Sequence, residues 1–124
     1  GAPRGQPHCS EIGCRRQALQ IPAGERYELC RAVHAEMNAL LQAGRDAEGC
    51  TLYLAGYEVA TGAPLRAQPC LLCSRVILNR GIAEVVMMRP PSEALAGPEP
   101  LSPIRVAPDN LMAVLEAGVD KGVR

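Results

Sequence analysis

Two short motifs that carry metal-ligating side chains constrain this chain more than any other feature of its sequence. The first motif places His34 two positions before Glu36. The second places Cys70 three positions before Cys73, directly after a proline. Two thiolates and one imidazole are donors that suit zinc, and three protein ligands leave one position of a tetrahedral ion open. The spacing therefore predicts a catalytic zinc ion bound by His34, Cys70 and Cys73.

Glu36 is the group in these motifs that can move protons. Zinc lowers the pKa of a water molecule in its open position to about 7. Glu36, which is not a ligand in this interpretation, would accept a proton from that water and pass it on to the reacting group. The alternative is a closed Cys/His zinc site in which Glu36 is an ordinary solvated helix residue. That alternative does not explain the carboxylate two residues after the histidine.

The sequence around the motifs predicts two helices and two parallel strands. Residues 33–43 show a helical stripe of Val33, Met37, Leu40 and Leu41, and a second helix is predicted from Pro69 to Gly81. Residues 50–55 and 83–88 have strand character, the first as a buried strand. A strand, helix and strand with short joins form a βαβ unit, whose ligands lie at the carboxyl ends of the strands. Both motifs then begin helices, so two helix N-termini can face one ion.

Residues two apart point to opposite sides of a regular helix, so His34 and Glu36 can share a site only at the helix N-terminus. Elsewhere the chain is predicted to be less regular. Residues 57–68 are expected to form a long polar loop, and the proline-rich stretch 89–108 an extended tail. A short helix is predicted over 109–117, with Leu111 facing inward. Cys50 is expected to be a small core residue.

A second, structural zinc is predicted in residues 1–31, which are otherwise expected to be mostly loop. His8, Cys9, Cys14 and Cys30 are four soft donors, enough for one closed tetrahedral ion. The alternative is a set of reduced, buried thiols with a surface histidine.

Composition limits the class of protein. A chain of 124 residues forms one domain, and its net charge of zero disfavours a nucleic-acid partner. No run approaches the roughly 18 apolar residues that a membrane span needs, and the first residues lack a signal-peptide pattern. Cysteines beside histidines and in a Cys-x-x-Cys pair favour metal binding over disulfides, so a cytoplasmic location is expected.

Residues 7–14, residues 24–39 and the pairs Gly81-Ile82 and Val85-Val86 together resemble the deoxycytidylate (dCMP) deaminase family of the cytidine/deoxycytidylate deaminase zinc-binding superfamily. The resemblance implies an α/β fold, a three-layer α/β/α sandwich of cytidine-deaminase type with a mixed sheet. The family has a helix and two strands before the stretch with which this chain begins. Residues 1–88 are therefore expected to be an amino-terminally incomplete deaminase domain, and residues 89–124 a proline-rich tail with a short helix.

The same resemblance implies a reaction and a homo-oligomer. The expected reaction is zinc-dependent hydrolysis of dCMP to dUMP and ammonia, in a homo-oligomer that is a dimer or a hexamer. From their places on either side of Glu36, Ala35 and Asn38 are the candidate substrate-binding residues, and the alternative for Asn38 is that it braces a loop. Two alternatives stay open: a deaminase of another nucleoside, nucleotide or pterin/flavin-type base, adenosine in tRNA included, and a zinc-stabilised module without catalytic activity.

Overall fold

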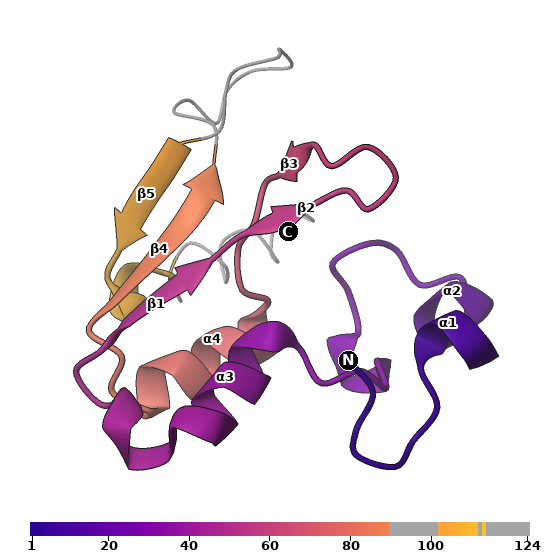
Figure 1. Cartoon of the computed structure of the whole chain (residues 1–124), viewed down its shortest axis with the longest axis horizontal. Coiled ribbons are helices and arrows are strands. Elements are labelled where there is room, and N and C mark those ends of the chain that lie inside the picture. The colour runs from indigo at the N-terminus through magenta and orange to yellow at the C-terminus, as the bar shows by residue number, and fades with distance from the viewer. Residues whose placement is uncertain (90–101, 112, 114–124) are drawn as a thin grey trace.

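A mixed three-stranded sheet lies against two helices in the computed structural model of this chain (Figure 1). The structure describes residues 1–89, 102–111 and 113. The α-helices are α1 (Cys9–Ile12), α2 (Arg15–Ala18), α3 (Ala35–Ala43) and α4 (Leu71–Asn79), and two 3-10 helices span Tyr27–Leu29 and Gly44–Ala47. The strands are β1 (Thr51–Leu54), β2 (Gly56–Tyr57), β3 (Pro64–Leu65), β4 (Glu84–Arg89) and β5 (Ser102–Val106).

The sheet has the order β1-β4-β5, and its first pair confirms the predicted βαβ unit. β1 and β4 are parallel, with Leu52 opposite Val85, and α4 is the helix that connects them. β5 then pairs antiparallel with β4, so the sheet is mixed. The α/β class with a mixed sheet is thus the predicted one. Among the described residues, α3 and α4 form a helical layer against one face of the sheet (Figure 1).

The apolar core lies between the sheet and these two helices. Val85 and Met87 alternate along β4 and are buried on the same face, as the two-residue period of a strand requires. They pack with Leu40 of α3 and Ile77 of α4. Leu111, in a helical turn that follows β5, joins the cluster and is 2% exposed, which confirms its inward position.

The prediction of an extended tail over 89–108 is wrong at β5. Residues 102–106 pair with β4, and Pro103 stands opposite Met88 in that register. Proline lacks an N–H, but β5 is at the edge of the described sheet, where one side of the strand needs no partner. Residues 90–101 lie outside the described residues, as does most of the helix predicted over 109–117.

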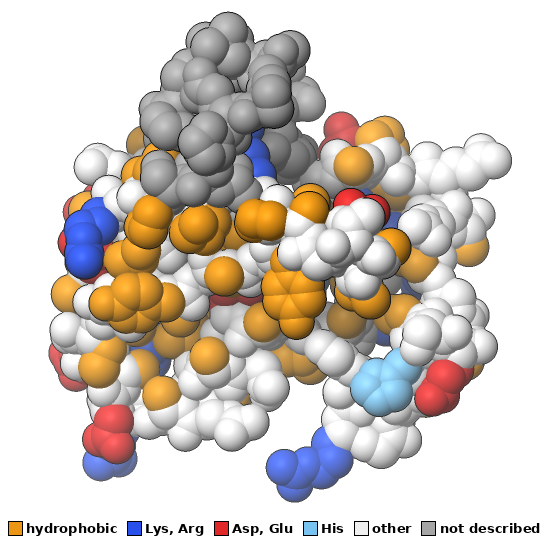
Figure 2. Space-filling model, turned by 45° about the horizontal axis from the view of Figure 1, so that its top comes forward, with side chains coloured by type: hydrophobic (Ala, Val, Ile, Leu, Met, Phe, Trp, Pro, Cys, Tyr) orange, Lys and Arg blue, Asp and Glu red, His pale blue; other side chains and the backbone are white. Residues whose placement is uncertain are grey.

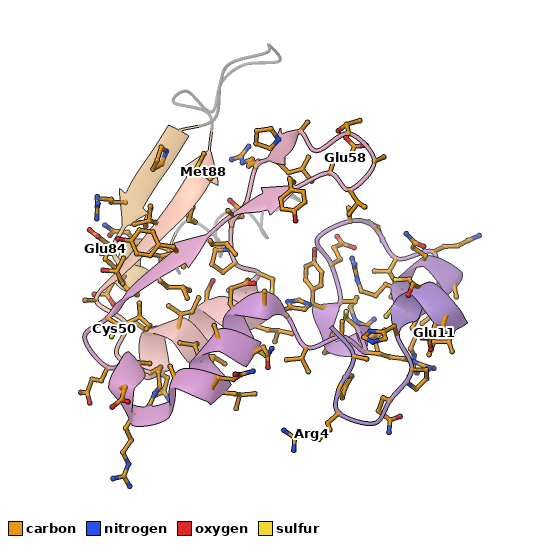
Figure 3. All side chains as sticks on the ribbon, viewed as in Figure 1. Arg4, Glu11, Cys50, Glu58, Glu84 and Met88 are labelled. Carbon is orange, nitrogen blue, oxygen red and sulfur yellow. The ribbon has the colours of Figure 1, made fainter. Side chains whose placement is uncertain are left out.

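The predicted polar loop over 57–68 contains a small hairpin. β2 and β3 pair antiparallel, with Gly56 opposite Leu65, and the chain between them turns at residues 58–63. Glu58 lies at this turn (Figure 3), where its backbone N–H bonds to the carbonyl of Ala63. Tyr57 and Val59 are 68% and 93% exposed. The hairpin therefore exposes apolar side chains to solvent. Hydrophobic side chains are also numerous on the face of the molecule that Figure 2 shows.

Three apolar residues are exposed although their side chains are predicted to be buried. Leu41 is 75% exposed rather than inward, because α3 turns Leu40 toward the core and each helical step rotates the next side chain by about 100°. Cys50 is exposed at the start of β1 (Figure 3), and its thiol bonds to the carbonyl of Asp46. Tyr53 is 71% exposed, so β1 is half-buried and not a buried strand. None of the described helices is both long enough and apolar enough to cross a membrane.

Candidate zinc site

His34 lies at the start of α3, and its backbone explains how it can share a site with Glu36. It is the N-cap residue, with an extended backbone (φ −66°, ψ 151°), and its side chain makes no capping hydrogen bond. Glu36 is in the first helical turn. Because His34 is not itself helical, the rule that residues two apart diverge does not apply to this pair. The predicted site at the helix N-terminus is therefore sterically possible.

Cys70 lies in the equivalent position at the start of α4. It is the N-cap residue, and its sulfur accepts a hydrogen bond from the backbone N–H of Cys73 at 3.4 Å. The hydroxyl of Ser74 donates to the carbonyl of Cys70 at 2.8 Å, which fixes the same turn. Pro69 is buried one position before the cap, not at the first helical position as predicted, because the cysteine takes the capping role. The two thiols thus belong to one rigid turn.

The three predicted ligands converge. The Nδ1 atom of His34 lies 3.5 Å from the sulfur of Cys70 and 3.4 Å from that of Cys73. Zinc–sulfur and zinc–nitrogen bonds of about 2.3 and 2.05 Å at a tetrahedral angle would place nitrogen and sulfur about 3.6 Å apart. All three ligand atoms lie within 4.8 Å of one another. The donor types and their spacing therefore fit a zinc ion.

The two thiols differ in their affinity for protons. The pKa of Cys70 is lowered to about 5, chiefly because the Cys73 side chain hydrogen-bonds to its sulfur, with the His34 imidazole adding to the effect. The pKa of Cys73 is raised, first by that hydrogen bond, then by burial and by the charges of Cys70 and Glu36. Without metal, the pair holds one thiolate and one thiol.

Glu36 lies beside the ligand cluster, and the two candidate substrate residues are exposed on the same helix. The Glu36 carboxylate is close enough to Cys73 to hydrogen-bond to its thiol and raise its pKa. Ala35 is exposed at the first position of α3. Asn38 is also exposed and lines a separate hollow of about 620 Å³ between α3 and residues 1–4. Their role in substrate binding stays a prediction.

The structure does not assemble the predicted second zinc site. His8 precedes α1, Cys9 begins it, Cys14 precedes α2, and Cys30 follows the 3-10 helix Tyr27–Leu29. Within the described residues, the group in which at least three ligand atoms lie within 4.8 Å of one another is the one at His34. The second ion stays a prediction from composition.

One contact of the site was not predicted from the sequence. The ring of Tyr27 lies edge-on to that of His34, with centroids 5.5 Å apart and an interplanar angle of 89°. The Arg16 guanidinium stacks on Tyr27, its Cζ 4.3 Å from the ring centroid. A lone tyrosine in an irregular segment carries no pattern that would reveal this contact.

A zinc-binding centre with three protein ligands and a neighbouring carboxylate is the class of site that this geometry defines. Residues 4–89 match the family model described as cytidine and deoxycytidylate deaminase zinc-binding region. The match covers more than half of the chain, and the chain belongs to this family.

Three curated relatives are named deoxycytidylate deaminase. The protein from Schizosaccharomyces pombe is 40% identical over 88 residues, and that from Saccharomyces cerevisiae is 39% identical over 88 residues. The third, from Mycobacterium phage D29, is 38% identical over 91 residues. Each alignment covers 69% of this chain, but only 24% of each yeast protein and 62% of the phage protein. No solved structure matches the chain.

Proposed function

We propose that this chain is the zinc-bearing part of a deaminase that hydrolyses dCMP to dUMP and ammonia. The observation that carries the proposal is the convergence of His34 Nδ1 on two cysteine sulfurs at 3.4 and 3.5 Å, with Glu36 beside them. A closed structural site would need a fourth protein ligand, and the ligand group in the described residues has three. The relatives' shared name favours dCMP over other cytosine compounds.

His34, Cys70 and Cys73 would hold the ion, which would act as a Lewis acid that activates water. The oxygen of that water would bond to C4 of the cytosine ring, and the bond from C4 to the amino nitrogen would break. Glu36 would receive a proton from the water and deliver it to N3 of the ring. It would then carry the second proton to the amino group, which leaves as ammonia.

The test is a substrate panel with ammonia release as the readout, on zinc-loaded protein. The panel includes dCMP, CMP, deoxycytidine, cytidine, adenosine and a flavin precursor. We expect turnover of dCMP, and a loss of about 10²- to 10⁴-fold in kcat for Glu36→Gln with zinc still bound. Glu11→Gln, which changes an exposed acid on α1 (Figure 3), is the matched control and should leave kcat unchanged.

The panel also separates the alternatives. Turnover of a different base, abolished in Glu36→Gln, would keep the chemistry and change the substrate. Zinc-loaded protein that releases ammonia from no compound in the panel would refute the proposal and favour a zinc-stabilised module.

We further expect one or two zinc ions per chain, a homo-oligomer and a cytoplasmic location. The six cysteines are unpaired in the structure, as a reducing compartment allows. Metal analysis would count the ions: a second zinc that is lost in Cys14→Ser would support the additional site. Light scattering after size-exclusion chromatography would distinguish a monomer, a dimer and a hexamer.

A further inference from the structure

The imidazole of His34 faces both cysteine sulfurs in the structure, although little in its own helix holds it there. The side chain caps no backbone N–H of α3. A ligand histidine is usually fixed by a hydrogen bond from its other ring nitrogen to a carboxylate or a carbonyl. Among the described residues, no hydrogen bond reaches Nε2 of His34. The orientation of the ring therefore depends on the contacts of Nδ1 with the two sulfurs and on packing against the ring itself.

Tyr27 packs against the imidazole ring of His34. Its ring meets that of His34 at 89° with centroids 5.5 Å apart, which is the edge-to-face geometry that aromatic rings prefer. Both side chains are half-buried, so the contact excludes water from one side of the imidazole. An edge-to-face contact restricts the tilt of a ring more than an aliphatic neighbour of the same size would.

Tyr27 is itself held by Arg16. The guanidinium stacks on the phenol ring at 4.3 Å, and its Nε and Nη2 donate to the carbonyls of Glu25 and Pro22 at 2.8 and 3.0 Å. These two bonds fix the guanidinium plane against the loop that leads to Tyr27. At Arg26 the chain adopts a left-handed backbone (φ 52°, ψ 46°) just before the 3-10 helix that carries the tyrosine. The turn and the stack thus position one ring.

We propose that Tyr27 and Arg16 are positioning residues for the zinc site, which hold the His34 imidazole with Nδ1 toward the two sulfurs before metal binds. Arg16 acts through Tyr27, and Tyr27 acts through His34. The segment before α3, outside both ligand motifs, then contributes to zinc affinity. The proposal rests on the zinc site of the proposed function.

Zinc affinity and coordination geometry measure this role directly. Metal-free protein is titrated with zinc against a chromophoric chelator, and with Co²⁺, whose visible absorption reports the geometry of its ligands. Tyr27→Leu should weaken zinc binding about two- to tenfold and alter the Co²⁺ spectrum. Tyr27→Phe keeps the ring and should stay within about twofold of wild type. Tyr53→Leu, at an exposed tyrosine of β1, is the matched control and should change neither.

Substitution of Arg16 tests whether this residue acts on the zinc site through Tyr27. Arg16→Met should weaken zinc binding by about two- to fivefold, and the double variant with Tyr27→Leu should bind no more weakly than Tyr27→Leu alone. Arg15→Met, at the exposed neighbour on α2, is its matched control. If Tyr27→Leu does not fold, as judged by circular dichroism, Arg16→Met decides the question.

Two outcomes would overturn the proposal. Folded Tyr27→Leu with wild-type zinc affinity and an unchanged Co²⁺ spectrum would show that the ring is only structural. Full additivity in the double variant would show that Arg16 does not act through Tyr27. A wild-type chain that binds no zinc would refute the proposed function as well, so the two failures are distinguishable.

Discussion

The unequal thiols of the zinc site lead to a prediction about metal-free protein. Cys70 has a pKa of about 5, so at pH 7 roughly 99% of it is thiolate, against about 3% for an unperturbed thiol. The thiolate is the species that reacts with iodoacetamide. Between pH 6 and 8 the alkylation rate of Cys70 should therefore stay nearly constant, and it should fall as the pH drops below about 5. The rate of an unperturbed cysteine peptide rises roughly a hundredfold over the same interval.

Removing the hydrogen-bond donor tests the cause of this shift. The Cys73 side chain is the largest influence on Cys70 and lowers its pKa. Cys73→Ala should therefore raise the pKa of Cys70 and move the inflection of the rate profile to higher pH. Cys73→Ser keeps an O–H donor and should move it less. Mass spectrometry of the peptide that contains Cys70 follows the rate at one site among six cysteines.

Two results would refute a lowered pKa of Cys70 or its assignment to Cys73. A Cys70 alkylation rate that climbs about tenfold per pH unit from pH 6 to 8 would mean that the thiol is unperturbed. An inflection that is the same in wild type and Cys73→Ala would mean that Cys73 is not the cause. In the zinc-loaded protein Cys70 should be protected, because the metal takes its lone pair and the proton of Cys73 is released.

Two further predictions concern the fold that carries the site. Ile77→Ala should cost about 2–5 kcal/mol of unfolding free energy in urea, because Ile77 is fully buried. Leu78→Ala, at a residue that is 39% exposed, should cost less than about 1 kcal/mol. Equal losses for the two variants would contradict the difference in burial. Gly81→Ala should destabilise by about 1–2 kcal/mol, since φ is +81° and the new Cβ would lie 3.2 Å from Glu48 Cγ. Gly56→Ala, where the nearest side-chain atom is 3.9 Å away, should be neutral or stabilising in the same urea titrations. The opposite order of the two free energies would refute the strain at Gly81.

The parts of the site that could be predicted are those encoded by neighbours in sequence. A cysteine that caps a helix and a second cysteine three residues later share one turn, so their proximity needs no knowledge of the fold. The meeting of His34 with that turn is long-range, because the βαβ unit of β1, α4 and β4 does not include α3, which packs beside α4 in the same layer. The same reasoning could not set the phase of α3. A stripe that contains both Leu40 and Leu41 allows two rotations, and packing against α4 selects Leu40.

The elements that were missed depend on pairing between distant segments. β5 contains Pro103 and follows a proline-rich stretch, so its composition argues against a strand, and its edge position is what permits it. β2 and β3 have two residues each, too few to show an alternating pattern. The contact between Tyr27 and His34 joins two irregular segments, where no periodicity places a side chain.

Substitutions of the zinc ligands should abolish zinc binding, whereas substitutions of the residues that orient them should only weaken it. The ligands lie at helix N-termini, where local backbone geometry presents them, so loss of His34 or Cys70 removes a bond that nothing else can replace. The segment with Arg16 and Tyr27 contributes no ligand and fixes only an orientation. Its loss leaves every bond possible and adds the entropy cost of ordering one imidazole. Zinc affinity should therefore fall steeply for substitutions in the two motifs and only by a small factor for those in the segment with Arg16 and Tyr27. The change in the Co²⁺ spectrum should follow the same order.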